Sequence, residues 1–354
     1  MITKNTMEKN HFSQIESPKN VKSFGLLPDG KEILCYTLQN KNGAELSVIN
    51  YGATITSLKI PTTENAKVDV VLGFDSVNDY IKSYYLPSPP YFGVIIGRFS
   101  GRINNAEFSL NGKRHFLNKN HGEHSLHGGI LGFSRKIWKV MIITLEENPS
   151  ITMEYISKSN EENFPGEVIV KVTYTLTEEN ELKVQYSAKS TEDTIINLTQ
   201  HTYFNLNGHK TDVTNLKLII NSDKILDTNK ELIPTGKFIT LKNNELDFSS
   251  AKQCPSAIDT TFALEKSDAV TLLSEKTKLK MTVHTNQPAV HVYVGGNCFN
   301  QLKGKESADY HSKSGICFET QNFPDAPNHS SFPSAVLKVG EEYHHQTTFT
   351  FENI

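Results

Sequence analysis

Apolar and polar residues alternate along much of this chain, and the alternation constrains its fold more than any other feature of the sequence. A period of two residues is typical of half-buried β-strands. It is clearest in VIVKVTYTL (168–176) and LKVQYSA (182–188), which the polar turn TEEN (177–180) separates. Further runs of this kind occupy residues 216–220, 278–283, 289–294, 315–320 and 343–351.

Turn residues between these runs support the same conclusion. Asn111-Gly112 stands between the runs 108–110 and 113–117, and Asn-Gly favours a tight hairpin turn. We expect no regular helix, and no Pro- or Ser-rich linker divides the chain. The sequence therefore predicts an all-β fold, a large antiparallel β-sandwich. We expect residues 21–354 to form one domain behind a polar, flexible tail at residues 1–20.

The net charge and composition do not favour a nucleic acid or an anionic membrane as a partner. The chain has 354 residues, a formal net charge of -3 and a pI near 6.5, whereas nucleic acids and anionic membranes attract basic surfaces. It has no apolar run of membrane-spanning length and no N-terminal signal sequence. Its four cysteines form no C-x-x-C pair, which favours reduced thiols. We expect a cytoplasmic monomer or homodimer with a small-molecule partner.

The segment IINLTQHTYFNL (residues 195–206) carries uncharged polar residues on one parity. His201 and Tyr203 share that parity with two asparagines, while the other parity is mostly apolar. A solvated outer face is one interpretation. Such faces usually carry Lys and Glu, however, and this one has none. Hydrogen-bonding groups with an imidazole suit a cleft for polyhydroxy compounds.

Two further runs show the same pattern. In residues 287–294 the valines share one face, while Gln287, His291 and Tyr293 share the other. In residues 315–320, Glu319 is a carboxylate near the end of an apolar strand, where burial could raise its pKa. A structural, ion-paired glutamate is the alternative. His201 and Glu319 together would supply an acid and a base.

A metal site is a competing interpretation of the histidines. His121, His124 and His127 have the spacing H-x-x-H-x-x-H, and three histidines can bind zinc. They lie in the Gly-rich stretch HGEHSLHGG, which does not resemble a helix or strand that would hold them on one side. We therefore expect no metal.

Six motifs in one order resemble those of the aldose 1-epimerase (galactose mutarotase) family, and the resemblance runs from about residue 25 to the C-terminus. They are DVVLGFD (69–75), YFGVIIGRFSGRI (91–103), SLHGG (125–129), NLTQHTYFNL (197–206), LIPTG (232–236) and ETQNFPDA (319–326).

The resemblance implies a galactose mutarotase-like supersandwich with an open cleft for one sugar, no metal and no organic cofactor. It also implies the roles of individual residues. Glu319 matches the general base and His201 the general acid. The positions that hold the sugar hydroxyls correspond to Arg102, His127 and Asp259, and Gln287 matches a further contact position. We also expect Tyr203 to contact the sugar, because it lies on the same face as His201.

Two positions depart from the family pattern. Gly101 stands where the family often has Asn, which removes a side-chain contact and leaves the sugar preference open. Asp259 is followed by Thr260-Thr261 rather than by His or Asn, so the sequence around Asp259 matches the family motif less completely than the sequences around His201 and Glu319.

The resemblance predicts interconversion of the α and β anomers of a free hexose such as galactose or glucose. Glu319 would take the proton of the C1 hydroxyl and His201 would protonate the ring oxygen. Two alternatives remain. A non-catalytic carbohydrate-binding module needs no acid–base pair. A hexose-phosphate 1-epimerase would need extra cations in the cleft, where the sequence places only Arg102.

Overall fold

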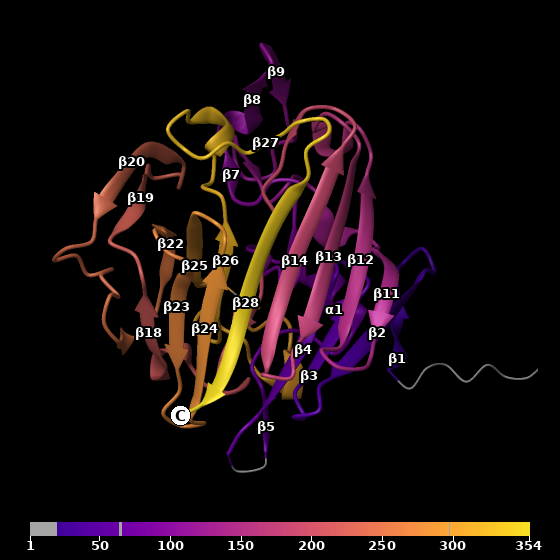
Figure 1. Ribbon diagram of the computed structural model, residues 1–354, viewed down its shortest axis with the longest axis vertical. Coiled ribbons are helices and arrows are strands. Elements are labelled where there is room, and N and C mark those ends of the chain that lie inside the picture. Colours follow the sequence, from indigo (N-terminus) through magenta and orange to yellow (C-terminus); the bar gives the residue numbers. More distant parts are fainter. Residues whose placement is uncertain (1–19, 64–65, 297) are drawn as a thin grey trace, which may run out of the picture.

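The computed structural model describes residues 20–63, 66–296 and 298–354, and it is built almost entirely from antiparallel sheets (Figure 1). The predicted all-β class is confirmed. The predicted tail, residues 1–20, lies outside the described residues except for Asn20. One short helix, α1 (Val77–Ser83), was not predicted. Ser76 caps it by accepting a hydrogen bond from the Asp79 amide, 3.2 Å away.

The largest sheet has nine strands. Their order is β11 (Lys139–Thr144), β12 (Ser150–Ser157), β13 (Val168–Leu176), β14 (Glu181–Ser190), β28 (Tyr343–Asn353), β24 (Leu279–Thr285), β23 (Asp268–Leu273), β18 (Lys217–Ile220) and β21 (Lys252–Gln253). Every second residue of β13 is buried from Val168 onward, so the alternation in the sequence corresponds to an inner and an outer face.

A six-stranded sheet carries most of the residues that matter below. Its order is β17 (Tyr203–Phe204), β26 (Ile316–Gln321), β25 (Ala289–Val294), β22 (Ile258–Ala263), β19 (Lys224–Thr228) and β20 (Pro234–Thr240). A five-stranded sheet is formed in sequence order by β1 (Val21–Leu26), β2 (Glu32–Gln39), β3 (Glu45–Ile49), β4 (Thr54–Pro61) and β5 (Lys67–Asp69).

The remaining elements are short. Four two-stranded ladders pair β6 (Ile95–Ile96) with β16 (Thr199–Gln200), β7 (Arg102–Ile103) with β10 (Ser125–Leu126), β8 (Glu107–Leu110) with β9 (Lys113–Phe116), and β15 (Thr194–Ile195) with β27 (Val336–Leu337). Short 3₁₀ turns occupy η1 (Asn104–Ala106), η2 (Phe133–Arg135), η3 (Glu161–Asn163), η4 (Val213–Asn215), η5 (Lys305–Ser307) and η6 (Ala326–Asn328). The predicted hairpin turn is confirmed, because Asn111 and Gly112 have φ angles of 51° and 76°.

One apolar cluster joins the three large sheets. It contains Leu46 of β3, Val170 of β13 and Phe318 of β26, all essentially inaccessible to water. The rings of Phe204 in β17 and Phe349 in β28 lie 5.0 Å apart and connect the six-stranded to the nine-stranded sheet. This shared core fixes the position of the six-stranded sheet.

The segment from Ile195 to Leu206 is not one continuous strand. It breaks into β15, β16 and β17, and each pairs with a different partner. Both parities are buried along it, so the solvated-face interpretation is wrong. The amides of Asn197 and Asn205 donate to backbone carbonyls inside the protein. Those two asparagines therefore hold loops together. His201 and Tyr203, which share their parity, line the cavity described below.

Strand β26 is buried at all six positions, because neighbours cover both its edges and both its faces. It pairs with β17 on one side and β25 on the other. The hydroxyl of Thr199 donates to the carbonyl of Thr320, 2.8 Å away. A rigid central strand thus carries Glu319.

Burial of His345 in β28 makes stability depend on pH. Burial lowers the pKa of His345 to about 3, although a backbone hydrogen bond with Leu198 opposes the shift. Between pH 6.5 and 3 the unfolded chain therefore binds a proton that the folded chain does not, so stability falls as the pH falls. At pH 5 this histidine alone should lower the free energy of unfolding by about 2 kcal/mol relative to pH 7.

Urea unfolding of the wild type and of His345→Gln at pH 7 and pH 5 measures this contribution. The variant should lose less stability on acidification than the wild type. An equal loss in both proteins would show that His345 does not resist protonation.

Candidate active site

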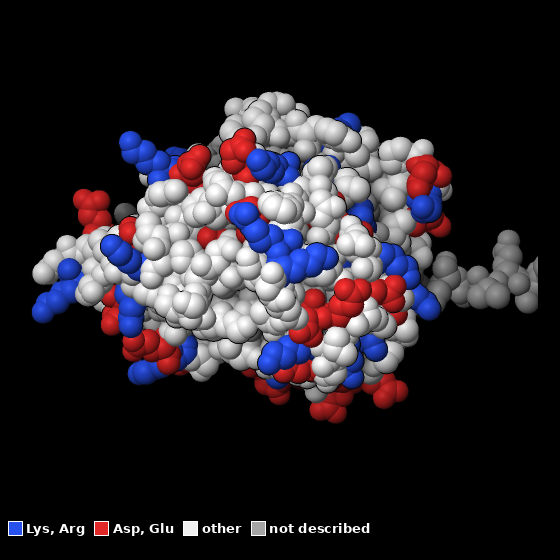
Figure 2. All heavy atoms as spheres, turned by 90° about the horizontal axis from the view of Figure 1, so that it is seen from above, with Lys and Arg blue, Asp and Glu red and all other residues white. Residues whose placement is uncertain are grey.

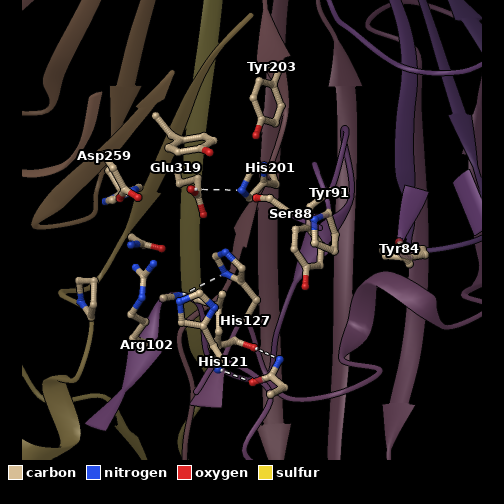
Figure 3. A pocket seen from close by; sticks show the side chains of 18 of the residues that line it. Tyr84, Ser88, Tyr91, Arg102, His121, His127, His201, Tyr203, Asp259 and Glu319 are labelled. Atoms are coloured by element: carbon tan, nitrogen blue, oxygen red, sulfur yellow. Dashed lines mark hydrogen bonds and ion pairs between the residues drawn. The ribbon is translucent and has the colours of Figure 1, made fainter. Parts of the chain in front are cut away.

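A cavity of about 410 Å³ opens over the six-stranded sheet and the loops beside it. Its size is that of a pocket for a small organic molecule. Figure 3 shows its polar lining, with Glu319 and His201 on one side, Arg102, His121 and His127 below them, and Tyr91 beyond. Acidic and basic side chains are interspersed on the face seen in Figure 2. A broad basic area is not visible there.

Glu319 and His201 meet inside this cavity. The Nε2 atom of His201 lies 3.5 Å from Oε1 of Glu319, and the two side chains are only 6% and 3% exposed. The second oxygen of Glu319, Oε2, is buried without a hydrogen-bond partner in the described protein. An unpartnered buried carboxylate oxygen is free to accept a proton or hydrogen bond from a bound ligand.

Two backbone hydrogen bonds and one side-chain contact hold His201 in place. The backbone amide of His201 donates to the carbonyl of Val94, and the backbone carbonyl of His201 accepts from the amide of Gly93, each at 2.9 Å. The Sγ atom of Cys317 lies 3.5 Å from Nδ1. Cys317 and Glu319 are two positions apart on β26, so one face of one strand contacts both ring nitrogens.

Opposing effects act on the protonation of His201. Burial is the largest and lowers its pKa, while the negative charge of Glu319 raises it. Burial dominates, and the pKa of His201 lies below the ordinary value of 6.5. A proton on this imidazole is therefore held weakly.

Asp259 and His291 form a second pair on the neighbouring strands. Nε2 of His291 lies 3.0 Å from Oδ1 of Asp259, and Nδ1 lies 2.8 Å from the hydroxyl of Thr261. Burial alone would lower the pKa of His291, but the hydrogen bond and charge of Asp259 raise it above the usual value. Burial raises the pKa of Asp259, yet His291 and Arg102 together bring it below the usual value. The pair is thus a charged wall of the cavity.

Arg102 and His127 come from the ladder of β7 and β10. Arg102 pairs with Leu126, which directly precedes His127. The amide of Gly101 points at Nδ1 of His127 at 3.4 Å, which favours the tautomer with its proton on Nε2. Burial, and then the charges of His201 and Arg102, keep the pKa of His127 well below its ordinary value. His127 is therefore a neutral hydrogen-bond donor.

Gly101, where this chain departs from the family pattern, has little room for a side chain. Its φ is +77°, and an added Cβ would stand 3.0 Å from the Cβ and Cγ atoms of Pro324. A side chain there would be strained by the backbone and crowded by the proline. The lack of a side chain leaves this part of the wall bare.

Of the residues predicted to contact the sugar, the structure brings Arg102, His127, Asp259 and Tyr203 to the cavity. It does not bring Gln287 there. Gln287 precedes β25, and its side chain bonds to Asn286 in the turn, 3.2 Å away. Four positions further, where β25 lies within the sheet, His291 lines the cavity instead. The sequence analysis recognised that Gln287 and His291 share a parity, but it did not show that the strand begins only after Gln287.

Other cavity residues were not assigned to the site by the sequence analysis. Tyr293 had been placed on the polar face with His291, while Tyr91 and Gln321 lie within two of the quoted motifs, and these positions were the available signal. Arg135, in contrast, lies on η2 with its guanidinium 4.2 Å from the ring centre of Tyr84. Arg135 lines the same cavity as Arg102, and nothing in the local sequence indicated this position.

Of the three histidines of the H-x-x-H-x-x-H stretch, only His127 belongs to a group of potential metal ligands among the described residues. Nδ1 of His124 accepts the amide of Asn105 at 3.1 Å, and His124 does not line the cavity. Among the described residues, His127, His201 and Glu319 instead have ligand atoms within 4.8 Å of one another. The Gly101 amide favours a proton on Nε2 of His127, so this cluster is better arranged for hydrogen bonding than for a metal.

A β-sandwich with a buried carboxylate–imidazole pair in an open polar cavity defines a class of enzymes that transfer protons on small polar molecules. The family model for aldose 1-epimerase matches residues 34–350. The galactose mutarotase of Sus scrofa is 34% identical over 93% of this chain and 97% of its own length. The aldose 1-epimerase of Haemophilus influenzae is 35% identical over 92% and 97%.

Solved structures agree with these relatives. An aldose epimerase homologue from C. elegans superposes with a TM-score of 0.84 and 26% identity, over 90% of this chain and 99% of that one. The chain belongs to the aldose 1-epimerase family and is an isomerase of that class. No helix among the described residues is long and apolar enough to cross a membrane.

The charge of Glu319 should be visible in the titration of His201. Glu319→Gln removes the negative charge that raises the pKa of His201, while burial remains, so this pKa should fall further. NMR titration of the His201 ring protons in wild type and variant measures the change.

Asp259→Asn is the matched control for this titration. Asp259 raises the pKa of His201 less than Glu319 does, and it also sustains the charge of His291, which lowers that pKa. These opposing effects should change the pKa of His201 by less than Glu319→Gln does. A pKa of His201 that is unchanged or higher in Glu319→Gln would contradict the electrostatic coupling.

Proposed function

We propose that Glu319 and His201 are the general base and general acid that interconvert the anomers of a free aldose such as galactose or glucose. One observation carries this assignment: the 3.5 Å separation of a buried imidazole nitrogen and a buried carboxylate oxygen within the cavity. Proton transfer by two positioned groups requires both to reach the same substrate. Family membership supports the reaction type.

Ring opening requires two proton movements. Glu319 removes the proton of the C1 hydroxyl, and protonated His201 delivers a proton to the ring oxygen as the bond between C1 and that oxygen breaks. The product is an open-chain aldehyde. Because the proton on His201 is weakly held, its transfer to a weakly basic ring oxygen is favoured.

Ring closure reverses these steps on the other face of the aldehyde. Rotation about the C1–C2 bond exposes that face. The C5 hydroxyl attacks C1 and returns its proton to His201, while Glu319 gives its proton to the former aldehyde oxygen. The reaction therefore needs no redox step and no net uptake of protons.

The other cavity side chains would hold the sugar during this cycle. We assign Arg102, His127, Asp259 and Tyr203 to its hydroxyl groups, with His291 in the place expected for Gln287. Positioning of this kind removes much of the entropy cost of reaction. Neutral His127 would donate, and ionised Asp259 would accept.

Removal of either catalytic group should abolish most of the rate enhancement. Each positioned proton transfer contributes about 10²–10⁴-fold, so Glu319→Gln and His201→Asn should each lose about that factor in kcat. Polarimetry of freshly dissolved α-galactose measures the rate. The exposed control Glu342→Gln should retain wild-type turnover. Folded variants with wild-type rates would refute the roles of Glu319 and His201.

One observation favours an anionic sugar as a second candidate substrate. Arg135 joins Arg102 in the cavity wall, and a guanidinium binds phosphate well. If Arg135 binds such a group, glucose 6-phosphate should turn over faster than glucose, and Arg135→Met should remove the difference. Equal or slower turnover of the phosphate in the wild type would leave the free sugar as the substrate.

We further propose that residues 21–354 act as one domain and that the protein is a cytoplasmic monomer or homodimer. The four buried free thiols of Cys35, Cys254, Cys298 and Cys317 support a reducing location. Saturable sugar binding without a rate effect would instead support a carbohydrate-binding module.

A further inference from the structure

A second cavity, of about 160 Å³, adjoins the first. The two share Arg102, Asp259, His291 and Pro324 in their walls. The second lies over β19, β20 and β22, on the far side of the Asp259–His291 pair from Glu319. The catalytic residues described above make no use of it.

The lining of this cavity is a mixture of aliphatic and polar residues. Ile225 and Leu226 of β19 and Ile239 of β20 contribute apolar surface, and Leu232 and Pro234 extend it. The polar residues Asp227, Thr228 and Thr260 interrupt this surface. Such a wall suits a small group that is partly apolar and also forms hydrogen bonds.

The order of the strands relates this cavity to one carbon of the sugar. His201 lies two residues before the start of β17, and Glu319, His291 and Asp259 follow on β26, β25 and β22, in the order in which these strands adjoin. If the proposed function holds, the ring oxygen faces His201 and the C1 hydroxyl faces Glu319. C1 is bonded to the ring oxygen, the hydroxyl oxygen and C2, so with the two oxygens facing His201 and Glu319, C2 would take the remaining side, toward His291 and Asp259. A substituent on C2 would then be directed toward the second cavity.

The volume limits the size of that substituent. A water molecule takes about 30 Å³, so 160 Å³ holds about five non-hydrogen atoms. A whole second sugar ring is too large, and a hydroxyl group would leave most of the space empty. An acetamido group has four non-hydrogen atoms, a methyl group for the aliphatic wall, and an amide for the polar atoms.

We propose that the second cavity is a subsite for an acylamino group at C2, and that this protein also interconverts the anomers of 2-acetamido-2-deoxyaldoses. This inference rests on the proposed function. The proton transfers are the same as for the free aldose, and the amide is unchanged by the reaction.

The test compares two substrates in three proteins. Polarimetry follows freshly dissolved α-galactose and α-2-acetamido-2-deoxygalactose with wild type, Ile239→Trp and Thr240→Trp. Ile239 lines the second cavity and is 41% exposed, so a larger side chain can be accommodated while part of it fills the cavity. Thr240 is the next residue of the same strand, points to the other face, and does not line the cavity.

The wild type should accelerate mutarotation of both sugars. Ile239→Trp should lower kcat/KM for the acetamido sugar by about tenfold or more and change that for galactose less than twofold, since pocket filling by a few atoms discriminates by roughly 10–200-fold. Thr240→Trp should leave both rates unchanged.

Two results would overturn the subsite: a wild type active on galactose without effect on the acetamido sugar, or an equal loss on both sugars in Ile239→Trp. Inhibition of galactose turnover by an unconverted acetamido sugar would also overturn it. A wild type inactive on both sugars would instead refute the proposed function.

Discussion

Two opposing forces act on one imidazole ring, and the arrangement of the surrounding sheets determines their balance. Burial removes water from His201 and disfavours its charge, while the carboxylate of Glu319 at 3.5 Å favours it. A buried pair of this kind costs desolvation energy, and the loss of either partner would leave the other uncompensated. The structure therefore has to hold both side chains firmly. It does so with β26, buried at every position, and with backbone bonds from His201 to Gly93 and Val94.

The fold class was predictable because alternation is a local property. In β13 every second residue is buried, and in the β8–β9 hairpin Asn111-Gly112 adopts the conformation that its composition favours. The segment 195–206 shows the limit of such reasoning. Its alternation was real, but its three short strands pair with partners from distant parts of the chain, so both parities are buried.

The site was predictable to the extent that strand parity and family motifs place residues. Parity grouped His201 with Tyr203, and it grouped His291 with Gln287, but it did not show that β25 begins only at Ala289. Arg135 and the second cavity could not be predicted, because they depend on how η2, β19 and β20 pack against distant strands. The short helix α1 was missed because its apolar pattern spans too few residues for a period of 3.6 to be visible.

Burial of the Glu319–His201 pair has a consequence for how successive catalytic cycles are linked. In the proposed cycle the carboxyl group gains one proton on opening and loses it on closure, while the imidazole does the reverse. The enzyme thus regains its starting charge state with each sugar released, whichever anomer entered. The cycle therefore requires no proton exchange with bulk water at any step, although the cavity itself is open.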